Sequence, residues 1–108
     1  MNTQIAITTE GNVTTVGVSD ESQEYLLWQI QEGDEQNIYS EYNDQNNSGY
    51  NNIKECTLML DGIHLVMSSG ELVHFYFNNL HKSEYLKLVS ALEIVYSSKP
   101  GVLEVIDK

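Results

Sequence analysis

The sequence predicts an α+β protein, in which an antiparallel β-sheet of about five to six strands packs against one main α-helix. Three observations lead to this fold class. Apolar residues alternate with polar ones in several short segments, an Asp-Gly step separates two of these segments, and the apolar period lengthens to that of a helix near the end of the chain. A chain of 108 residues suits a single domain spanning residues 1–108.

The first half of the chain carries the signals of several strands. Residues 5–18 are rich in β-branched side chains, and Glu10-Gly11-Asn12 predicts a turn between two short strands. Residues 24–30 alternate, which places Leu26, Trp28 and Ile30 on one face of a strand and Tyr25, Leu27 and Gln29 on the other. Residues 38–42 are a weaker strand candidate, for which a short helix is the alternative.

Residues 56–77 predict a three-stranded meander. The Asp61-Gly62 step between two alternating apolar segments is a strong hairpin signal. A two-residue turn there predicts the pairs Leu60–Ile63, Leu58–Leu65 and Cys56–Met67, all facing the core. A second turn at Ser69-Gly70 leads to a third strand. In that strand we expect Val73, Phe75 and Phe77 to continue the inward face, and His74 and Tyr76 to join His64 outside.

The segment from Ser83 to Tyr96 changes to helical spacing. Its apolar residues form one stripe, made of Tyr85, Leu88, Val89, Leu92, Val95 and Tyr96. Ser83 is the predicted N-cap, and Glu84 lies suitably close to the positive end of the helix. Pro100-Gly101 ends this element, and residues 102–106 form a final short strand or a docked tail.

The charge of the chain narrows its possible partners. Sixteen acidic residues stand against five lysines, no arginine is present, and the net charge is −11. Nucleic acids and anionic membranes attract basic surfaces, so we expect neither as a partner and expect a basic protein instead. No signal peptide or membrane-spanning segment is recognisable, which favours the cytoplasm.

The residues with catalytic potential do not form a recognisable active site. The predicted hairpin turns Cys56 into the core and His64 and His74 outward, so a sheet separates the thiol from any histidine base. The acidic clusters, such as Glu32, Asp34 and Glu35, lie in polar connectors where nothing would raise a carboxyl pKa. We therefore expect a protein that is not an enzyme and needs no cofactor or metal.

Residues 33–55 form a polar stretch rich in acids, amides and tyrosines, and a calcium loop is one interpretation of it. Oxygen ligands, a glycine and a closing glutamate follow EF-hand spacing at the positions Asp44, Asn46, Ser48, Gly49 and Glu55. Asn51 stands where such loops place an apolar residue, and the flanking helices are not predicted. A weak calcium-binding module and a non-catalytic adaptor domain remain the alternatives to a protein-recognition surface.

The order of motifs from Glu24 to Tyr96 resembles bacterial toxin-immunity proteins of the immunity protein 10 family. The resemblance rests on "EYLLWQIQ", "DEQN" and "IYSEYNDQNNSGYNNI", followed by an alternating strand pair and a terminal helix. The acidic element of that family matches Asp34, Glu35 and Gln36, its strand end matches Tyr42, Asn43, Asp44 and Gln45, and its turn matches Ser48, Gly49 and Tyr50. Asn51-Asn52 stands where the family has two glycines, and asparagine tolerates the same left-handed backbone.

The resemblance implies that the chain neutralises a cognate bacterial toxin, in many cases a nuclease. The acidic composition agrees with this, because an acidic inhibitor can occupy the basic cleft of such an enzyme, and tyrosines can supply the buried anchors. The predicted toxin-binding residues are Asp34, Glu35, Gln36, Glu41, Tyr42, Asp44 and Tyr50. The sequence leaves open whether they would cover the active site of the toxin or a neighbouring surface.

Overall fold

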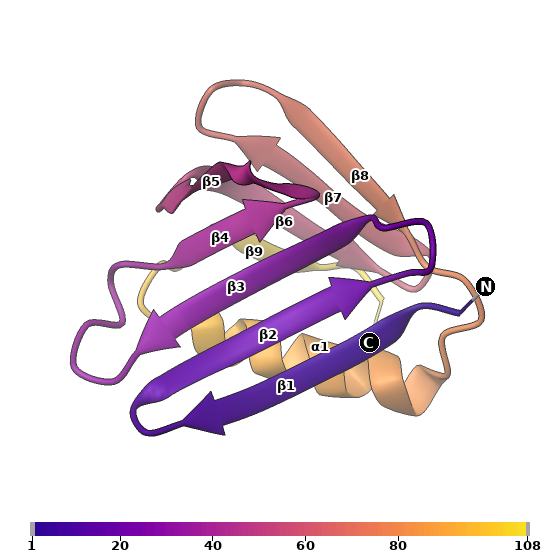
Figure 1. Cartoon of the computed structure of the whole chain (residues 1–108), viewed down its shortest axis with the longest axis horizontal. Coiled ribbons are helices and arrows are strands. Elements are labelled where there is room, and N and C mark those ends of the chain that lie inside the picture. The colour runs from indigo at the N-terminus through magenta and orange to yellow at the C-terminus, as the bar shows by residue number, and fades with distance from the viewer. Residues whose placement is uncertain (1, 108) are drawn as a thin grey trace.

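The computed structural model describes residues 2–107, which form nine β-strands in two sheets and one α-helix (Figure 1). The five-stranded sheet contains β1 (Gln4–Glu10), β2 (Val13–Ser19), β3 (Tyr25–Gln31), β4 (Tyr39–Tyr42) and β5 (Asp44–Tyr50). The four-stranded sheet contains β6 (Ile53–Met59), β7 (Gly62–Met67), β8 (Leu72–Tyr76) and β9 (Leu103–Val105). The helix α1 (Lys82–Val95) connects β8 to β9. The predicted α+β class, with one main helix, is confirmed.

Each sheet is built largely from strands that are neighbours in the sequence. In the five-stranded sheet β1 to β5 follow one another in order, and every pair is antiparallel. The four-stranded sheet has the order β8-β7-β6-β9, and β9 pairs in parallel with β6. The predicted meander therefore exists as β6, β7 and β8, and residues 102–106 do contain a strand.

The two sheets share one core, which α1 closes on one side. The helix contacts β1, β2, β3 and β9, and it runs behind β1–β3 in Figure 1. Its whole predicted apolar stripe is buried, as are Leu26, Trp28 and Ile30 of β3. The indole Nε1 of Trp28 donates a 2.8 Å hydrogen bond to the hydroxyl of Tyr96, which ties the centre of the sheet to the end of the helix. Within residues 2–107 the opposite face of β1–β3 stays uncovered (Figure 1).

The hairpin between β6 and β7 differs from the prediction by the position of its turn. The turn residues are Leu60 and Asp61, and the pairs are Leu58–Ile63 and Cys56–Leu65. The predicted inward position of Leu60 is wrong, because this side chain lies in the turn and is 50% exposed. Gly62 belongs to β7, where a Cβ atom would lie 2.4 Å from the carbonyl oxygen of Phe75. This glycine is thus required by the close approach of β8 and not by the turn.

The outward residues of the meander lie where alternation predicts them. His64 pairs with His74 across β7 and β8, and their rings meet edge to face with centroids 4.3 Å apart. Tyr76 continues the same face and is 60% exposed. Cys56 on the other face is fully buried, and burial raises the pKa of its thiol to about 12. The thiol is therefore protonated and enclosed at neutral pH.

The helix starts differently from the prediction. It begins at Lys82 with His81 as its N-cap, and the His81 side chain makes no capping hydrogen bond. Ser83 lies inside the first turn, so its prediction as the N-cap is wrong. Glu84 does lie in the first turn, where its charge favours the positive helix end. The helix has 14 residues, and no helix within residues 2–107 has the length and apolarity needed to cross a membrane.

Candidate functional site

The candidate site is the outer face of β3, β4 and β5, the face that points away from the core. Strand alternation turns Leu26, Trp28 and Ser40 inward, which leaves the residues between them outside. On neighbouring strands Gln29 stands opposite Tyr39, and Tyr39 stands opposite Tyr50. We call the outward group formed by Tyr25, Tyr39, Glu41 and Tyr50 the tyrosine face.

Glu41 is the centre of the tyrosine face. Its Oε1 accepts a 2.6 Å hydrogen bond from the hydroxyl of Tyr39, and its Oε2 accepts a hydrogen bond from the hydroxyl of Tyr25. These bonds favour the protonated phenols, so the hydrogen bond to Glu41 raises the pKa of Tyr25 to about 12 and also raises the pKa of Tyr39. The carboxylate and both rings are thereby held in fixed positions before any partner arrives.

Tyr50 extends the tyrosine face to the edge of the sheet. Its ring meets that of Tyr39 edge to face, with centroids 5.5 Å apart, yet the residue remains 67% exposed. The two rings border a shallow hollow of about 90 Å³, which Gln29, Gln31 and Asp34 also line. An exposed aromatic ring beside a hollow and a carboxylate is the kind of surface that binds another protein.

The amides of the polar stretch build the turns that hold these strands. Asn43 has a φ of 60° between β4 and β5, and its Oδ1 accepts a 2.8 Å hydrogen bond from the backbone N–H of Tyr25. Asn51 has a φ of 54° after β5, and its Oδ1 accepts a 3.1 Å hydrogen bond from the backbone N–H of Ile38. Asn43 and Asn51 thus adopt the left-handed conformation that asparagine tolerates better than most other residues.

Three of the predicted toxin-binding residues lie together. Glu41 and Tyr50 belong to the tyrosine face, and Asp34 reaches its hollow from the loop between β3 and β4. Glu35 and Gln36 are exposed in the same loop. The Glu35 carboxylate accepts a 2.7 Å hydrogen bond from the backbone N–H of Gly33, which lowers the pKa of this group.

Tyr42 and Asp44 lie apart from that group. Tyr42 stands opposite Leu26 on the inward side of β4, packs against the core and donates its hydroxyl proton to Glu71, which precedes β8. Asp44 is exposed beside the turn at Asn43, and its Oδ1 accepts a 2.8 Å hydrogen bond from the backbone N–H of Asn46. The seven predicted residues therefore do not form one continuous surface.

The charges are divided unequally between the two halves of the chain. No lysine, arginine or histidine occurs before Lys54, so the five-stranded sheet has no basic side chain. Nine of the sixteen acidic residues occur in the same part of the chain, three in its strands and six in the loops between them: Glu10, Asp20, Glu21, Glu24, Glu32, Asp34, Glu35, Glu41 and Asp44. The tyrosine face is thus part of a purely acidic sheet, and a cationic partner would meet no repulsion on it.

Comparisons with protein-family models, with curated proteins and with solved structures find no match to this chain. The resemblance to the immunity protein 10 family accordingly stays a prediction from the sequence.

The conformation of residues 44–55 does not provide the calcium loop considered above. Asp44, Asn46 and Ser48 lie along the extended strand β5, whereas Glu55 lies in β6 of the other sheet. An EF-hand loop instead wraps its ligands around one ion. No cluster of three or more His, Cys, Asp or Glu side chains suited to a metal is found within residues 2–107.

Tyr25 and Tyr39 are the members of the site that the sequence-based prediction missed. Alternation of residues 24–30 already placed Tyr25 on the outer face, and Tyr39 is separated from Glu41 by one residue, which puts both on the same side of a strand. What the sequence lacks is the pairing of β3 with β4, and only this pairing brings Tyr25 to Glu41. The sequence therefore indicates that Tyr25 and Tyr39 point outward, but it does not indicate that Tyr25 contacts Glu41.

The hydrogen bond between Tyr25 and Glu41 should make the stability of the folded protein depend on pH above pH 10.0. Since folding raises the pKa of Tyr25 from 10.0 to about 12, we expect this bond to contribute stability fully below pH 10.0 and to lose that contribution as the pH rises to about 12. In the Glu41→Gln variant the Tyr25 pKa should fall toward its ordinary value. Tyrosinate absorbance measures the titration, and the step that disappears in Tyr25→Phe identifies Tyr25. An unchanged step in Glu41→Gln would contradict the proposed cause.

Proposed function

We propose that this chain is an immunity protein that binds and neutralises a basic bacterial toxin domain through the tyrosine face, acting in the cytoplasm without catalysis. The observation that supports this best is the outward tyrosine face, with Tyr50 67% exposed, on a sheet with no basic side chain. The sequence resemblance to the immunity protein 10 family points to the same function. A nuclease is the favoured toxin class, because enzymes that bind phosphate backbones need a basic cleft.

The aromatic part of the tyrosine face would supply most of the binding energy. Tyrosine offers a large contact area at a small entropic cost, and hot spots of protein interfaces are enriched in it. The hydroxyls of Tyr25 and Tyr39 are already engaged by Glu41, so little side-chain freedom remains to be lost on binding. Tyr50 is the most exposed of the three rings and is the expected anchor.

The acidic part would determine which partners are attracted and how fast they bind. The nine carboxylates before Lys54, a part of the chain that contains no basic side chain, produce a negative field, which attracts a basic domain and speeds its association. Salt screens such a field over a distance of about 10 Å at 0.1 M ionic strength. We therefore infer an association rate that falls steeply as salt is added.

The test begins with the gene immediately upstream, which under this proposal encodes a secreted protein with a C-terminal toxin domain. Co-expression should protect cells from that domain, and Tyr50→Ala should raise the dissociation constant by about 30-fold or more. Tyr76→Ala is the matched control, because Tyr76 is similarly exposed but lies in the four-stranded sheet, and it should leave binding unchanged.

Three outcomes would count against the proposal. The first is the absence of any toxin domain whose activity this chain relieves. The second is equal loss of affinity in Tyr50→Ala and Tyr76→Ala, which would remove the tyrosine face as the binding surface. The third is an association rate that does not change with ionic strength. This result would show that the charge of the acidic sheet does not speed association. Stopped-flow mixing and calorimetry measure the last two.

A further inference from the structure

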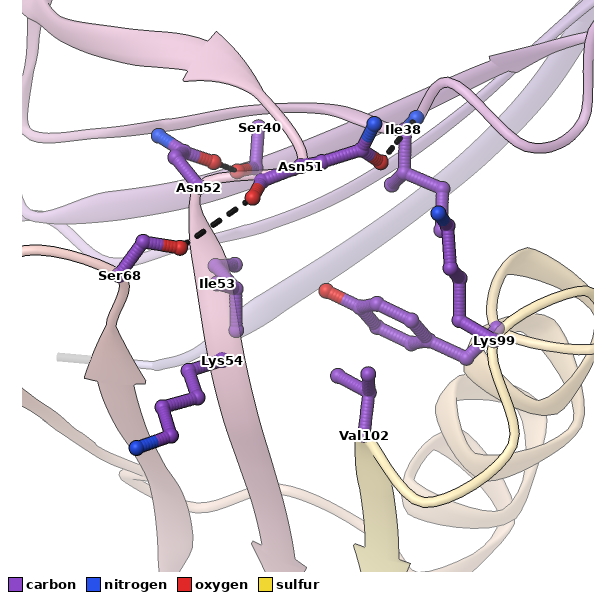
Figure 2. Close-up of a pocket in the computed structure, with 10 residues that line it drawn as sticks. Ile38, Ser40, Asn51, Asn52, Ile53, Lys54, Ser68, Lys99 and Val102 are labelled. Carbon is purple, nitrogen blue, oxygen red and sulfur yellow. Dashed lines mark hydrogen bonds between the residues drawn. The ribbon is translucent and has the colours of Figure 1, made fainter.

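A second possible binding site lies where the two sheets meet near the end of α1. It is a half-enclosed pocket of about 230 Å³, close to the turn between β5 and β6 (Figure 2). Its apolar walls are formed by Ile38, Ile53, Val102 and Tyr96. This volume lies somewhat below that of pockets for drug-sized ligands, so the pocket suits one small organic molecule.

The polar wall of this pocket is rigid before any ligand binds. Asn51 accepts a 3.1 Å hydrogen bond from the backbone N–H of Ile38 through its side chain and a 3.3 Å hydrogen bond from the hydroxyl of Ser68 through its backbone carbonyl. Ser40, which is buried, donates its hydroxyl proton to the side chain of Asn52. These bonds connect both sheets around the opening (Figure 2). The pocket is thus a built feature of the sheet junction.

The charge at the pocket is opposite to that of the protein. None of the sixteen acidic residues lines it, whereas Lys54 and Lys99 do. Figure 2 shows the Lys99 side chain extending toward Ile38 and the Lys54 side chain pointing away from the other labelled residues. Lys99 is half-buried, and its ammonium group has no hydrogen-bond or ion-pair partner among the described side chains. A cation without a partner at the rim of an apolar pocket favours an anion beside it.

Tyr96 provides a second hydrogen-bond donor in the pocket wall. Its hydroxyl oxygen accepts the bond from Trp28, and no hydrogen bond donated by this hydroxyl is found within residues 2–107. Burial raises the pKa of Tyr96, so this proton is retained at neutral pH. An anion in the pocket could therefore accept from the Tyr96 hydroxyl and from the Lys99 ammonium group.

We propose that this pocket binds a small carboxylate with an apolar body, such as a single-ring or branched-chain acid. The carboxylate would pair with Lys99, and the apolar body would lie against Ile38, Ile53 and Val102. The pocket and the tyrosine face involve different sides of the molecule, since Ser40 and Tyr96 point inward while Tyr39 and Glu41 point outward. The proposal therefore does not depend on the toxin-binding function.

The test uses the full chain and sodium benzoate as the probe. We expect saturable shifts in the methyl NMR signals of Ile38, Ile53 and Val102 and at least about tenfold weaker binding of benzamide, which has the same shape without the charge. Lys99→Met should reduce benzoate affinity by about tenfold or more. Lys87→Met is the matched control, because Lys87 lies on the exposed helix surface beside Glu84, and it should leave the affinity unchanged.

The other outcomes overturn the proposal. Benzamide binding as well as benzoate would remove the role of the charge, and this comparison needs no variant. Inorganic phosphate or acetate binding as well as benzoate would remove the role of the apolar walls. Shifts confined to other parts of the chain, an undiminished affinity in Lys99→Met, or no saturation with benzoate would each show that the pocket is not a carboxylate site.

Discussion

The Gly62→Ala substitution is expected to lower the free energy of unfolding by about 3 kcal/mol or more. A Cβ atom at this position would lie 2.4 Å from the carbonyl oxygen of Phe75 and 3.3 Å from the Cα of Tyr76. Both neighbours are backbone atoms of the paired strand β8, so no side-chain rotation can relieve the clash. β7 and β8 would have to separate at the end opposite their connecting turn, directly beside the buried pair of Ile63 and Phe75.

Gly17→Ala is the matched control for this substitution. Gly17 also lies in a strand between two others, but its added Cβ would come no closer than 3.8 Å, to the carbonyl oxygen of Ala6. Because alanine loses less conformational entropy on folding than glycine, we expect stability to be unchanged or slightly increased. Urea denaturation of both variants measures the difference. Equal effects in the two variants would mean that β7 and β8 do not approach as closely as described.

The Trp28→Phe substitution is expected to cost about 2–4 kcal/mol of stability. Trp28 is fully buried in the centre of the five-stranded sheet, and phenylalanine would leave part of its volume empty. The substitution also removes the indole N–H that bonds to Tyr96. Tyr96→Phe keeps the ring but leaves the indole N–H without its acceptor, which should cost about 1–3 kcal/mol.

The double variant separates the hydrogen bond from the packing. Because Trp28 and Tyr96 share one hydrogen bond, the two substitutions together should cost less than the sum of the single effects, since the second change removes a partner already lost. Tyr76→Phe serves as the control, since Tyr76 is exposed and should change stability by less than about 0.5 kcal/mol. Strictly additive effects in denaturant unfolding would contradict the contact.

Periodicity was sufficient for the elements that face the core. The alternation around Trp28 and the helical stripe around Leu92 each have one consistently buried side, and the structure buries both as predicted. Burial of one face is the constraint that makes such patterns readable, because a shift by one residue would expose the whole apolar set. Alternation mispredicts Leu60 because this residue lies in the turn between β6 and β7 and not on the inward face of a strand.

The edge of the five-stranded sheet could not be predicted from apolar patterning. β5 has the sequence "DQNNSGY", whose only large apolar side chain is the exposed Tyr50, so alternation gives no signal there. Its pairing is instead determined by the turns at Asn43 and Asn51. Asn51 follows the last strand of this sheet, and the next strand, β6, belongs to the other sheet. Without an apolar pattern, β5 adds to the strand number that the sequence predicted as about five to six, whereas the two sheets together have nine.

The candidate site was predictable in part. Glu41 and Tyr50 lie on the tyrosine face, but Tyr42 follows Glu41 directly and must therefore point to the other side of β4. The motif placed Glu41 and Tyr42 in one group because they are adjacent in the sequence. A protein surface, in contrast, is formed by residues of several neighbouring strands that point to the same side. The pairing of β3, β4 and β5 is what selects Tyr25, Tyr39, Glu41 and Tyr50 as one group.

The parallel pairing of β9 with β6 has a consequence for the order in which the chain assembles. Every other strand pair joins neighbours in the sequence, so the hairpins of both sheets can close through short loops at low entropic cost. β9 has three residues and pairs with β6, from which β7, β8 and α1 separate it along the chain. We therefore expect β9 to dock last during folding and to detach first during unfolding. Its detachment should leave β1–β5 and β6–β8 folded.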